Sequence, residues 1–308
     1  MKILVICNKT KLLGRMDLNI LYNLEALRRF SDAIYWGDGW GYDVPIEEVI
    51  AKRKPQLVYY AGDAGSCDYS SAPNVRLPKV VYMEDYWADL DERLGILEAG
   101  NFDYLVTKNK PCVDFYLNKF PRLKHILNPH GYNPDIFKFE EVEKKWDFTV
   151  CGRIDERYRL RSKVLDLVGS LDALGYKVYV KPHPGYWDRG EARVDNGQQV
   201  LAEVANQSRV CLAGCGTGNQ CHMAKIWELS ATSAVCFTDA NPLDGDYEKI
   251  GQHVHLCDVN WDDQKILDEI RLTIDNWQVS KFYSFFNRYA SIVERARDLV
   301  LDFERIVR

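Results

Sequence analysis

The stretch that decides the fold runs from Val210 to Asp239 and reads VCLAGCGTGNQCHMAKIWELSATSAVCFTD. Its apolar runs predict strands over Val210–Ala213 and Ala234–Thr238, with a glycine-rich turn and a helix between them. Glycines at such a turn let backbone N–H groups approach an anion that the start of the helix also favours. Glu228 lies about 12 Å along that helix. This separation suits a nucleotide, with phosphates at the turn and a ribose hydroxyl on the carboxylate, although the same pattern also occurs with a structural role.

The composition is that of a globular protein with room for two domains. The chain has 308 residues, of which 46% are hydrophobic and 28% are charged. It contains no uncharged apolar run of about 18 residues, and Lys9 and Lys11 follow the first strand too closely for a signal peptide. Nine scattered cysteines without a CxxC pair favour a reducing cytoplasm, and no zinc-binding set can be assembled. The net charge of −5 disfavours a nucleic-acid partner but leaves room for a local basic groove.

Strand and helix patterns alternate along the whole chain, which is typical of doubly wound parallel sheets. In the first half, strands are expected at Met1–Ile6, Ala33–Tyr35, Gln56–Tyr60, Lys79–Met83, Tyr104–Thr107 and His125–Leu127. A loop rich in Pro, Gly and Asn and a charged stretch precede a second alternation, from Phe148–Cys151 to His253–Cys257. We therefore predict an α/β protein with Rossmann-like domains over residues 1–140 and 141–280, and a C-terminal helix over 281–308 that packs back on the first domain.

Three segments match motifs of a known enzyme family. They are HGYNPDIFKF at His130–Phe139, FTVCGRIDERYRLRSK at Phe148–Lys163, and the helix containing Lys225–Glu228. Together they resemble GT-B fold glycosyltransferases, nearest to the group 1 and spore-maturation-type subgroups. The resemblance implies two Rossmann-like domains facing a cleft, a nucleotide-sugar bound by the second domain, and an acceptor bound by the first. In this family a Glu eight positions after another Glu grips the donor; Glu228 matches the second, but Gln220 replaces the first, which disfavours the usual retaining mechanism.

The diphosphate of a nucleotide-sugar needs positive charge around it, which Arg side chains and helix N-termini provide. Arg153 follows Gly152 at a strand end, on the edge where ligands bind in open α/β sheets. Arg161 fits either diphosphate binding or a solvated helix face, and Lys225 fits either the donor or an ion pair with Glu228. His183 stands between two prolines that fix its backbone. The expected donor-binding residues are Arg153, Arg161, Lys181, His183, Gly216, Thr217, Lys225 and Glu228.

The acceptor hydroxyl must lose a proton, so an inverting transferase needs a general base from the first domain. Asp85 follows the expected strand Lys79–Met83 and is predicted to be this base; Glu84 is the alternative, and Asp85 also fits a helix N-cap. The basic segment after the first strand is either an acceptor-binding loop or a solvated turn. The expected acceptor contacts are Lys9, Lys11, Gly14, Arg15 and Trp87.

These residues predict metal-independent transfer of a sugar from a nucleotide-sugar to a hydroxyl of a glycan or small molecule, with inversion favoured. No cofactor is expected beyond the nucleotide-sugar co-substrate, and no transmembrane segment is expected. One alternative is a phage-type transferase that glycosylates a modified DNA base, for which the Lys9–Arg15 segment and the pair Lys108 and Lys110 give limited support. The other is a non-catalytic nucleotide-binding GT-B protein, which Gln220 would fit.

Overall fold

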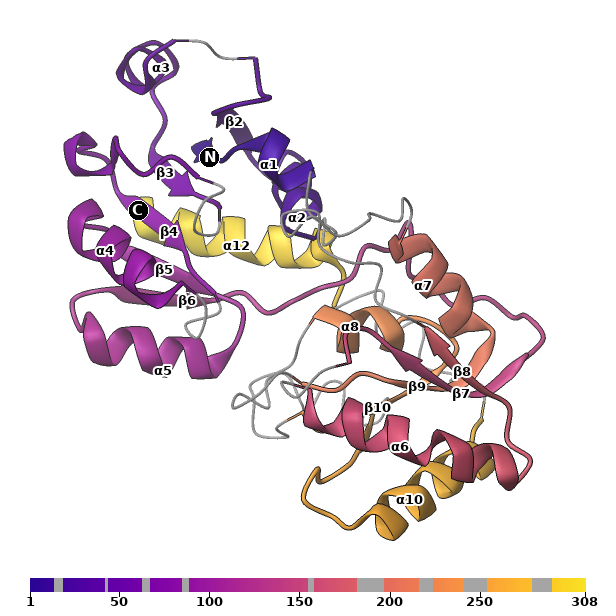
Figure 1. Cartoon of the computed structure of the whole chain (residues 1–308). Helices are drawn as coiled ribbons and strands as arrows, with labels where there is room; N and C mark the ends of the chain where they lie inside the picture. Colours follow the sequence, from indigo (N-terminus) through magenta and orange to yellow (C-terminus); the bar gives the residue numbers. More distant parts are fainter. Residues whose placement is uncertain are drawn as a thin grey trace. The chain divides into compact units, whose positions relative to one another are not determined.

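The computed structural model describes residues 1–13, 19–41, 44–62, 67–84, 89–154, 158–181, 197–215, 224–240, 254–278 and 290–308. It divides into two compact units, Met1–Pro129 together with Ile292–Arg308, and His130–Ser291 (Figure 1). The division falls before His130 rather than near residue 140, because Tyr132 and Phe137 are fully buried in a core of the second unit.

The first unit contains a six-stranded parallel sheet with the strand order β2-β1-β3-β4-β5-β6. Its strands are β1 (Lys2–Ile6), β2 (Asp32–Trp36), β3 (Leu57–Tyr60), β4 (Lys79–Tyr82), β5 (Tyr104–Thr107) and β6 (Lys124–Leu127). They confirm the strands predicted from the apolar runs. Because β1 lies between β2 and β3, the chain order reverses there, and such a topological switch point is where open α/β sheets bind ligands.

Helices cover both faces of the first sheet. On one face lie α2 (Asn19–Leu27) and α12 (Ile292–Val307), and on the other lie α3 (Ile46–Arg53), α4 (Leu90–Gly100) and α5 (Lys110–Lys119). Alternate strand residues point to opposite faces, so Tyr59 packs with α2 and α12 while Tyr60 packs with the other three helices. The structure also describes two shorter helical segments in this unit, α1 (Lys9–Leu13) and the 3-10 helix η1 (Ala72–Asn74).

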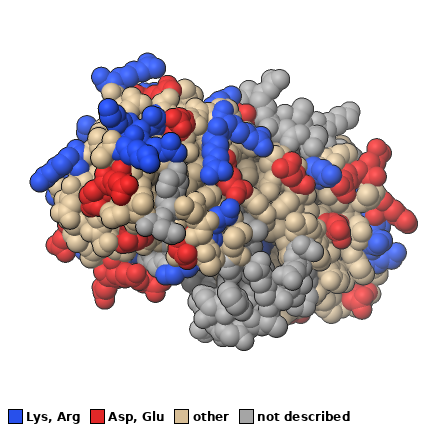
Figure 2. All heavy atoms as spheres, turned by 90° about the horizontal axis from the view of Figure 1, so that it is seen from above, with Lys and Arg blue, Asp and Glu red and all other residues tan. Residues whose placement is uncertain are grey.

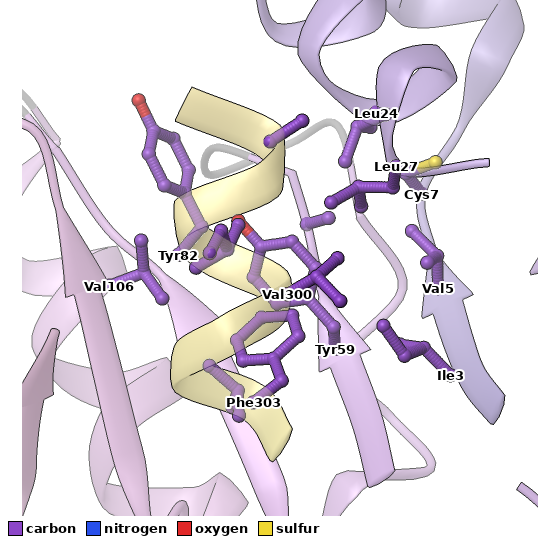
Figure 3. Close-up of a cluster of buried hydrophobic side chains, with 14 of the residues drawn as sticks. Ile3, Val5, Cys7, Leu24, Leu27, Tyr59, Tyr82, Val106, Val300 and Phe303 are labelled. Carbon is purple, nitrogen blue, oxygen red and sulfur yellow. The ribbon is translucent and has the colours of Figure 1, made fainter. Parts of the chain in front are cut away.

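The last helix, α12, belongs to the core of the first unit. Its sequence places Ala296, Leu299, Val300 and Phe303 on one stripe, and each of them is at most 3% exposed. Figure 3 shows Val300 and Phe303 beside Tyr59. The rings of Phe303 and Tyr59 meet edge to face, with their centroids 5.1 Å apart. The end of the chain therefore completes the layer of helices over the first sheet.

The second unit contains a five-stranded parallel sheet with the strand order β11-β10-β9-β7-β8. Its strands are β7 (Trp146–Cys151), β8 (Val178–Lys181), β9 (Ser208–Leu212), β10 (Val235–Thr238) and β11 (Val254–Leu256). One face is covered by α6 (Arg159–Ala173) and α10 (Asp263–Asp275), and the other by α7 (Gly197–Asn206) and α8 (Ala224–Ser230). Here the switch point lies between β7 and β9.

Candidate functional site

The candidate site of the second unit is built around Gly152, the residue that follows β7. Gly152 has a φ of +99°, which L side chains rarely adopt. A Cβ at this position would lie 3.1 Å from Nη1 of Arg161 and 3.4 Å from Nζ of Lys225. Gly152 thus allows the turn, and its missing side chain lets two cationic groups approach the end of β7.

Arg161 lies beneath this turn in the first part of α6. Its side chain donates from Nη1 to the carbonyl oxygen of Arg153 at 3.0 Å and from Nη2 to that of Gly214 at 2.6 Å. The residue is only 4% exposed, so the interpretation as a solvated helix face is wrong. Burial lowers the pKa of the guanidinium, which nevertheless stays charged at neutral pH. One buried cation therefore joins the turns that follow β7 and β9.

The part of the chain that the structure describes does not satisfy every N–H of this guanidinium. Its Nε is buried and has no hydrogen-bond partner among the residues that the structure describes. The face of the guanidinium lies over the Tyr158 ring, with 4.1 Å between its carbon and the ring centroid. Both Nη contacts are to neutral carbonyls. The positive charge is thus held in place without being neutralised by these two contacts, which is a suitable environment for a nearby anion.

The turn after β9 is also fixed by its neighbour in the sheet. The backbone N–H of Cys215 donates to Oδ1 of Asp239 at 2.7 Å, and Oγ1 of Thr238 donates to the carbonyl of Ala213 at 2.7 Å. Burial raises the pKa of the Asp239 carboxyl, whereas the bond from Cys215 opposes that rise. The sequence analysis did not identify Asp239 as a residue of the site. Its position directly after β10 is the signal that could have found it, because Arg153 was identified from a similar position after β7.

Helix α8 contributes Lys225 and Glu228. Glu228 is 5% exposed, and Nε2 of Gln198 on α7 donates to its Oε1 at 3.2 Å. The apolar neighbours Ile226 and Trp227 are both 1% exposed and anchor α8 on the sheet. The carboxylate is therefore held by a side chain from another helix. Gln198 was not identified from the sequence, since nothing local to it predicts this contact across the fold.

The expected donor-binding residues divide into two groups. In the first group, Arg161 and Lys225 both approach Gly152, and the carbonyl of Arg153, the next residue along the chain, accepts from Arg161. Lys181 ends β8 in register with Cys151, and Glu228 lies one turn beyond Lys225. The second group, His183, Gly216 and Thr217, lies outside the described residues. The same holds for the predicted base Asp85 and for three predicted acceptor contacts, Gly14, Arg15 and Trp87.

In the first unit, the segment after β1 differs from the predicted loop or turn. Lys9–Leu13 is a short helix, because Oδ1 of Asn8 caps it by accepting the N–H of Lys11 at 2.8 Å and Leu12 is buried. Nζ of Lys9 lies 4.6 Å from the centroid of the Trp40 ring, whereas Lys11 lines a cavity of about 410 Å³ at the carboxyl ends of β1 and β2. The two predicted acceptor lysines thus have different surroundings.

Glu84, the alternative to Asp85, is at the end of β4. It is 9% exposed, and its Oε2 accepts a hydrogen bond from the hydroxyl of Tyr82. The hydroxyl of Tyr116 donates to its backbone carbonyl at 3.4 Å. The Glu84 carboxylate is therefore a largely buried, hydrogen-bonded group.

The described part of the chain offers neither a cluster of metal ligands nor a membrane-spanning helix. No group of three or more His, Cys, Asp or Glu side chains there is arranged to hold a metal ion. None of the helices described is long and apolar enough to cross a membrane.

Comparison with known proteins identifies the fold. No protein-family model and no curated protein matches the chain. Among solved structures, it is similar to a sucrose-phosphate synthase from Thermosynechococcus elongatus, with a TM-score of 0.55 and 12% identity over 85% of this chain and 76% of that one. It is also similar to a chain of a GtfA/B complex, with a TM-score of 0.51 and 10% identity over 85% of this chain and 60% of that one. The fold is therefore GT-B-like, and the prediction of this fold is confirmed.

Proposed function

We propose that this protein is a glycosyltransferase that moves a sugar from a nucleotide-sugar donor to a hydroxyl group. The observation that carries the proposal is the pair of cations at the switch point of the second sheet, where Arg161 and Lys225 both approach Gly152. A diphosphate leaving group gains negative charge as the glycosidic bond breaks, so cations already in place favour the transition state. The similarity in fold to a sucrose-phosphate synthase supports the same class of chemistry.

The donor residues have distinct proposed roles. Lys225 and Arg153 contact the diphosphate together with Lys181, His183, Gly216 and Thr217. Arg161 is a positioning residue, because its Nη atoms already bond the carbonyls of two turns, and it adds positive charge beneath them. Glu228 accepts a hydrogen bond from a ribose hydroxyl, and Gln198 orients its carboxylate.

The proposed chemistry is a direct, metal-independent displacement that inverts the anomeric carbon. The acceptor oxygen forms a bond to that carbon while the bond to the diphosphate breaks, and Asp85 takes the hydroxyl proton. Glu84 is less suited to this role, because its carboxylate is largely buried and bonded to Tyr82. A product that retains the anomeric configuration of the donor would contradict the assignment of Asp85.

No specific observation favours the alternative of a DNA acceptor. Figure 2 shows that on one face of the molecule Asp and Glu side chains interrupt the Lys and Arg side chains among the described residues. The net charge of the chain is −5. A duplex or single strand binds to a continuous basic surface, so a glycan or small-molecule acceptor is the better proposal.

A reducing, cytoplasmic location is part of the proposal. The described cysteines are all free thiols, and Cys7, Cys112 and Cys151 are among those that are buried. Free thiols at buried positions are typical of proteins that fold in a reducing compartment.

The test is a thermal-shift screen with UDP, GDP, CDP, ADP, dTDP and their sugar conjugates. One nucleotide should raise the melting temperature, since a ligand at about 100 times its Kd stabilises by roughly 2.7 kcal/mol. Glu228→Gln should weaken that nucleotide about tenfold, because a hydrogen bond to a charged group contributes about 1.5–3 kcal/mol. Glu203→Gln, an exposed carboxylate on α7, is the matched control and should bind as the wild type does.

Three outcomes would contradict the proposal. If no nucleoside diphosphate stabilises the protein, or if folded Glu228→Gln binds with unchanged affinity, the donor site is wrong. If the donor binds but is never cleaved, with or without acceptors, the protein is instead a non-catalytic nucleotide-binding protein.

A further inference from the structure

The first unit has a cavity of about 410 Å³ at the carboxyl ends of β1 and β2. Its polar and aromatic lining comes from Asn8, Lys11, Trp36, Asp38 and Asp68. These residues follow or end strands on both sides of the β1 switch point, where the chain order in the sheet reverses. The volume lies within the range of about 300–1,000 Å³ that is usual for small-molecule sites. Position and size together indicate a ligand site in this unit.

One wall of the cavity is fixed before any ligand binds. Gly37, Gly39 and Gly41 all line it and have φ values of +123°, +81° and +77°. A Cβ at Gly37 would lie 2.4 Å from the carbonyl oxygen of Cys7, so β1 and this turn approach each other closely. The N–H of Lys9 donates to the carbonyl of Asp38 at 2.8 Å and holds the same turn from the other side. The wall is therefore preorganised, which reduces the entropy lost on binding.

The groups that line the cavity favour a neutral ligand with several hydroxyls. Asp38 and Asp68 are exposed carboxylates, and a carboxylate accepts hydrogen bonds from ligand hydroxyls. Oδ1 of Asp68 accepts the N–H of Ser70 at 2.9 Å, which fixes the carboxylate beside the cavity. Trp36 presents a partly buried indole whose Nε1 donates to the carbonyl of Val44 at 2.8 Å, so the ring is held in one orientation. An aromatic surface packs against the apolar C–H face of a sugar ring. Among the lining residues that the structure describes, two are carboxylates and Lys11 is the one cation, so this lining repels a ligand that carries several phosphates.

We infer that this cavity binds a neutral saccharide, and that this saccharide is the acceptor of the proposed transfer. Asp38 and Asp68 accept its hydroxyl hydrogens, and Trp36 packs against the ring. This inference rests on the proposed function, and it adds the chemical class of the acceptor. It also assigns specificity to residues that follow β2 and β3, beyond the basic segment that follows β1.

The test is saturation-transfer NMR on the full chain with a panel of probes. The panel contains neutral methyl glycosides of glucose, galactose, mannose and N-acetylglucosamine, together with glucose 6-phosphate and a single-stranded oligonucleotide. At least one neutral glycoside should receive saturation from the protein. Asp38→Asn and Asp68→Asn should each weaken its binding about tenfold, because each substitution removes a charge-assisted hydrogen bond. Asp172→Asn, at an exposed position of α6, should have no effect.

Three results would overturn the inference. They are the absence of saturation transfer to every neutral glycoside, binding that neither Asp38→Asn nor Asp68→Asn weakens, and preferential binding of the phosphate or the oligonucleotide. Both variants replace exposed side chains by groups of the same shape, so their thermal unfolding should match the wild type. If nucleotides still stabilise the protein while glycosides do not bind, only this inference fails. If glycosides bind while no nucleotide does, the proposed donor site fails instead.

Discussion

The two units have the same kind of switch point but opposite charge around it. After β7, the second unit buries Arg161 beneath two turns and brings Lys225 to within 3.4 Å of the Cβ position of Gly152. At the ends of the strands that flank β1, the first unit lines a cavity with the exposed carboxylates of Asp38, which follows β2, and Asp68, which follows β3. Each sheet edge also depends on a glycine at positive φ, at Gly152 and Gly37. Since the topology is shared, the difference in ligand must come from side chains rather than from the fold.

The largest expected effect comes from removing the buried cation of the second unit. Arg161→Met should lower the free energy of unfolding by roughly 3 kcal/mol, because the carbonyls of Arg153 and Gly214 lose their donor in a buried place. Urea denaturation measures this loss, and Arg159→Met on the exposed side of the same helix is the control.

Arg161→Lys tests whether the site of the second unit can be changed without affecting the cavity of the first unit. It keeps the charge but lacks the planar fork that reaches both carbonyls. Donor binding should therefore weaken in Arg161→Lys, while glycoside binding by the first unit should not change. If donor affinity is the same in Arg161→Lys and the wild type, the planar fork of Arg161 is not needed for donor binding. For the preceding prediction, equal stability of Arg159→Met and Arg161→Met would contradict the stabilising role of the buried contacts of Arg161.

The next prediction compares Gly37 and Gly152, the glycines at positive φ beside the two switch points. Gly37→Ala should cost about 2–3 kcal/mol, because its Cβ would lie 2.4 Å from a backbone carbonyl at a strained φ. Gly152→Ala should cost somewhat less, about 1–2 kcal/mol, since the nearest atoms belong to the side chain of Arg161. Gly169→Ala in α6, where a Cβ meets nothing within 4 Å, should instead stabilise by about 0.5–1 kcal/mol. Thermal unfolding of the three variants gives the order of their stabilities. If Gly37→Ala is as stable as the wild type, the close approach of Gly37 to the carbonyl of Cys7 is contradicted.

The last prediction concerns a dependence of stability on acid that arises in the first unit. Burial lowers the pKa of His125 from 6.5 to about 4, and the ring lies 3.1 Å from Oγ1 of Thr107. Between these pH values the unfolded chain binds a proton that the folded chain does not, so stability falls as the pH drops from 6.5 towards 4. The loss should be on the order of 2 kcal/mol. His125→Gln should remove this part of the pH dependence in urea denaturation; an unchanged dependence would mean that His125 is accessible to protons in the folded state.

The central strands were predictable because they are short apolar runs, as in β3 and the last residues of β1, which parallel strands buried on both faces must be. The edge strands β6 and β11 are less buried, and their apolar signal is shorter. Arg153 and Glu228 could also be proposed from the sequence, since each lies near the end of a strand or helix whose limits the pattern of apolar residues predicts. The burial of Arg161 was not, because it depends on Gly214, which lies 53 positions away in the chain. Contacts of this kind, like that between Gln198 and Glu228, arise only when separate elements pack together. The short helix α1 was missed although its cap, Asn8, carries a recognisable local signal.

The central claim is that the cations of the second unit bind a diphosphate, and calorimetric titration tests it most directly. The wild type should bind the preferred nucleoside diphosphate at least about 100-fold more tightly than the corresponding nucleoside, because charge-assisted contacts are made only with the phosphates. Lys225→Gln should reduce that ratio about tenfold, and Lys265→Gln, an exposed lysine of α10, should leave it unchanged. Equal affinity for nucleoside and nucleoside diphosphate, or a ratio that Lys225→Gln does not alter, would contradict the claim.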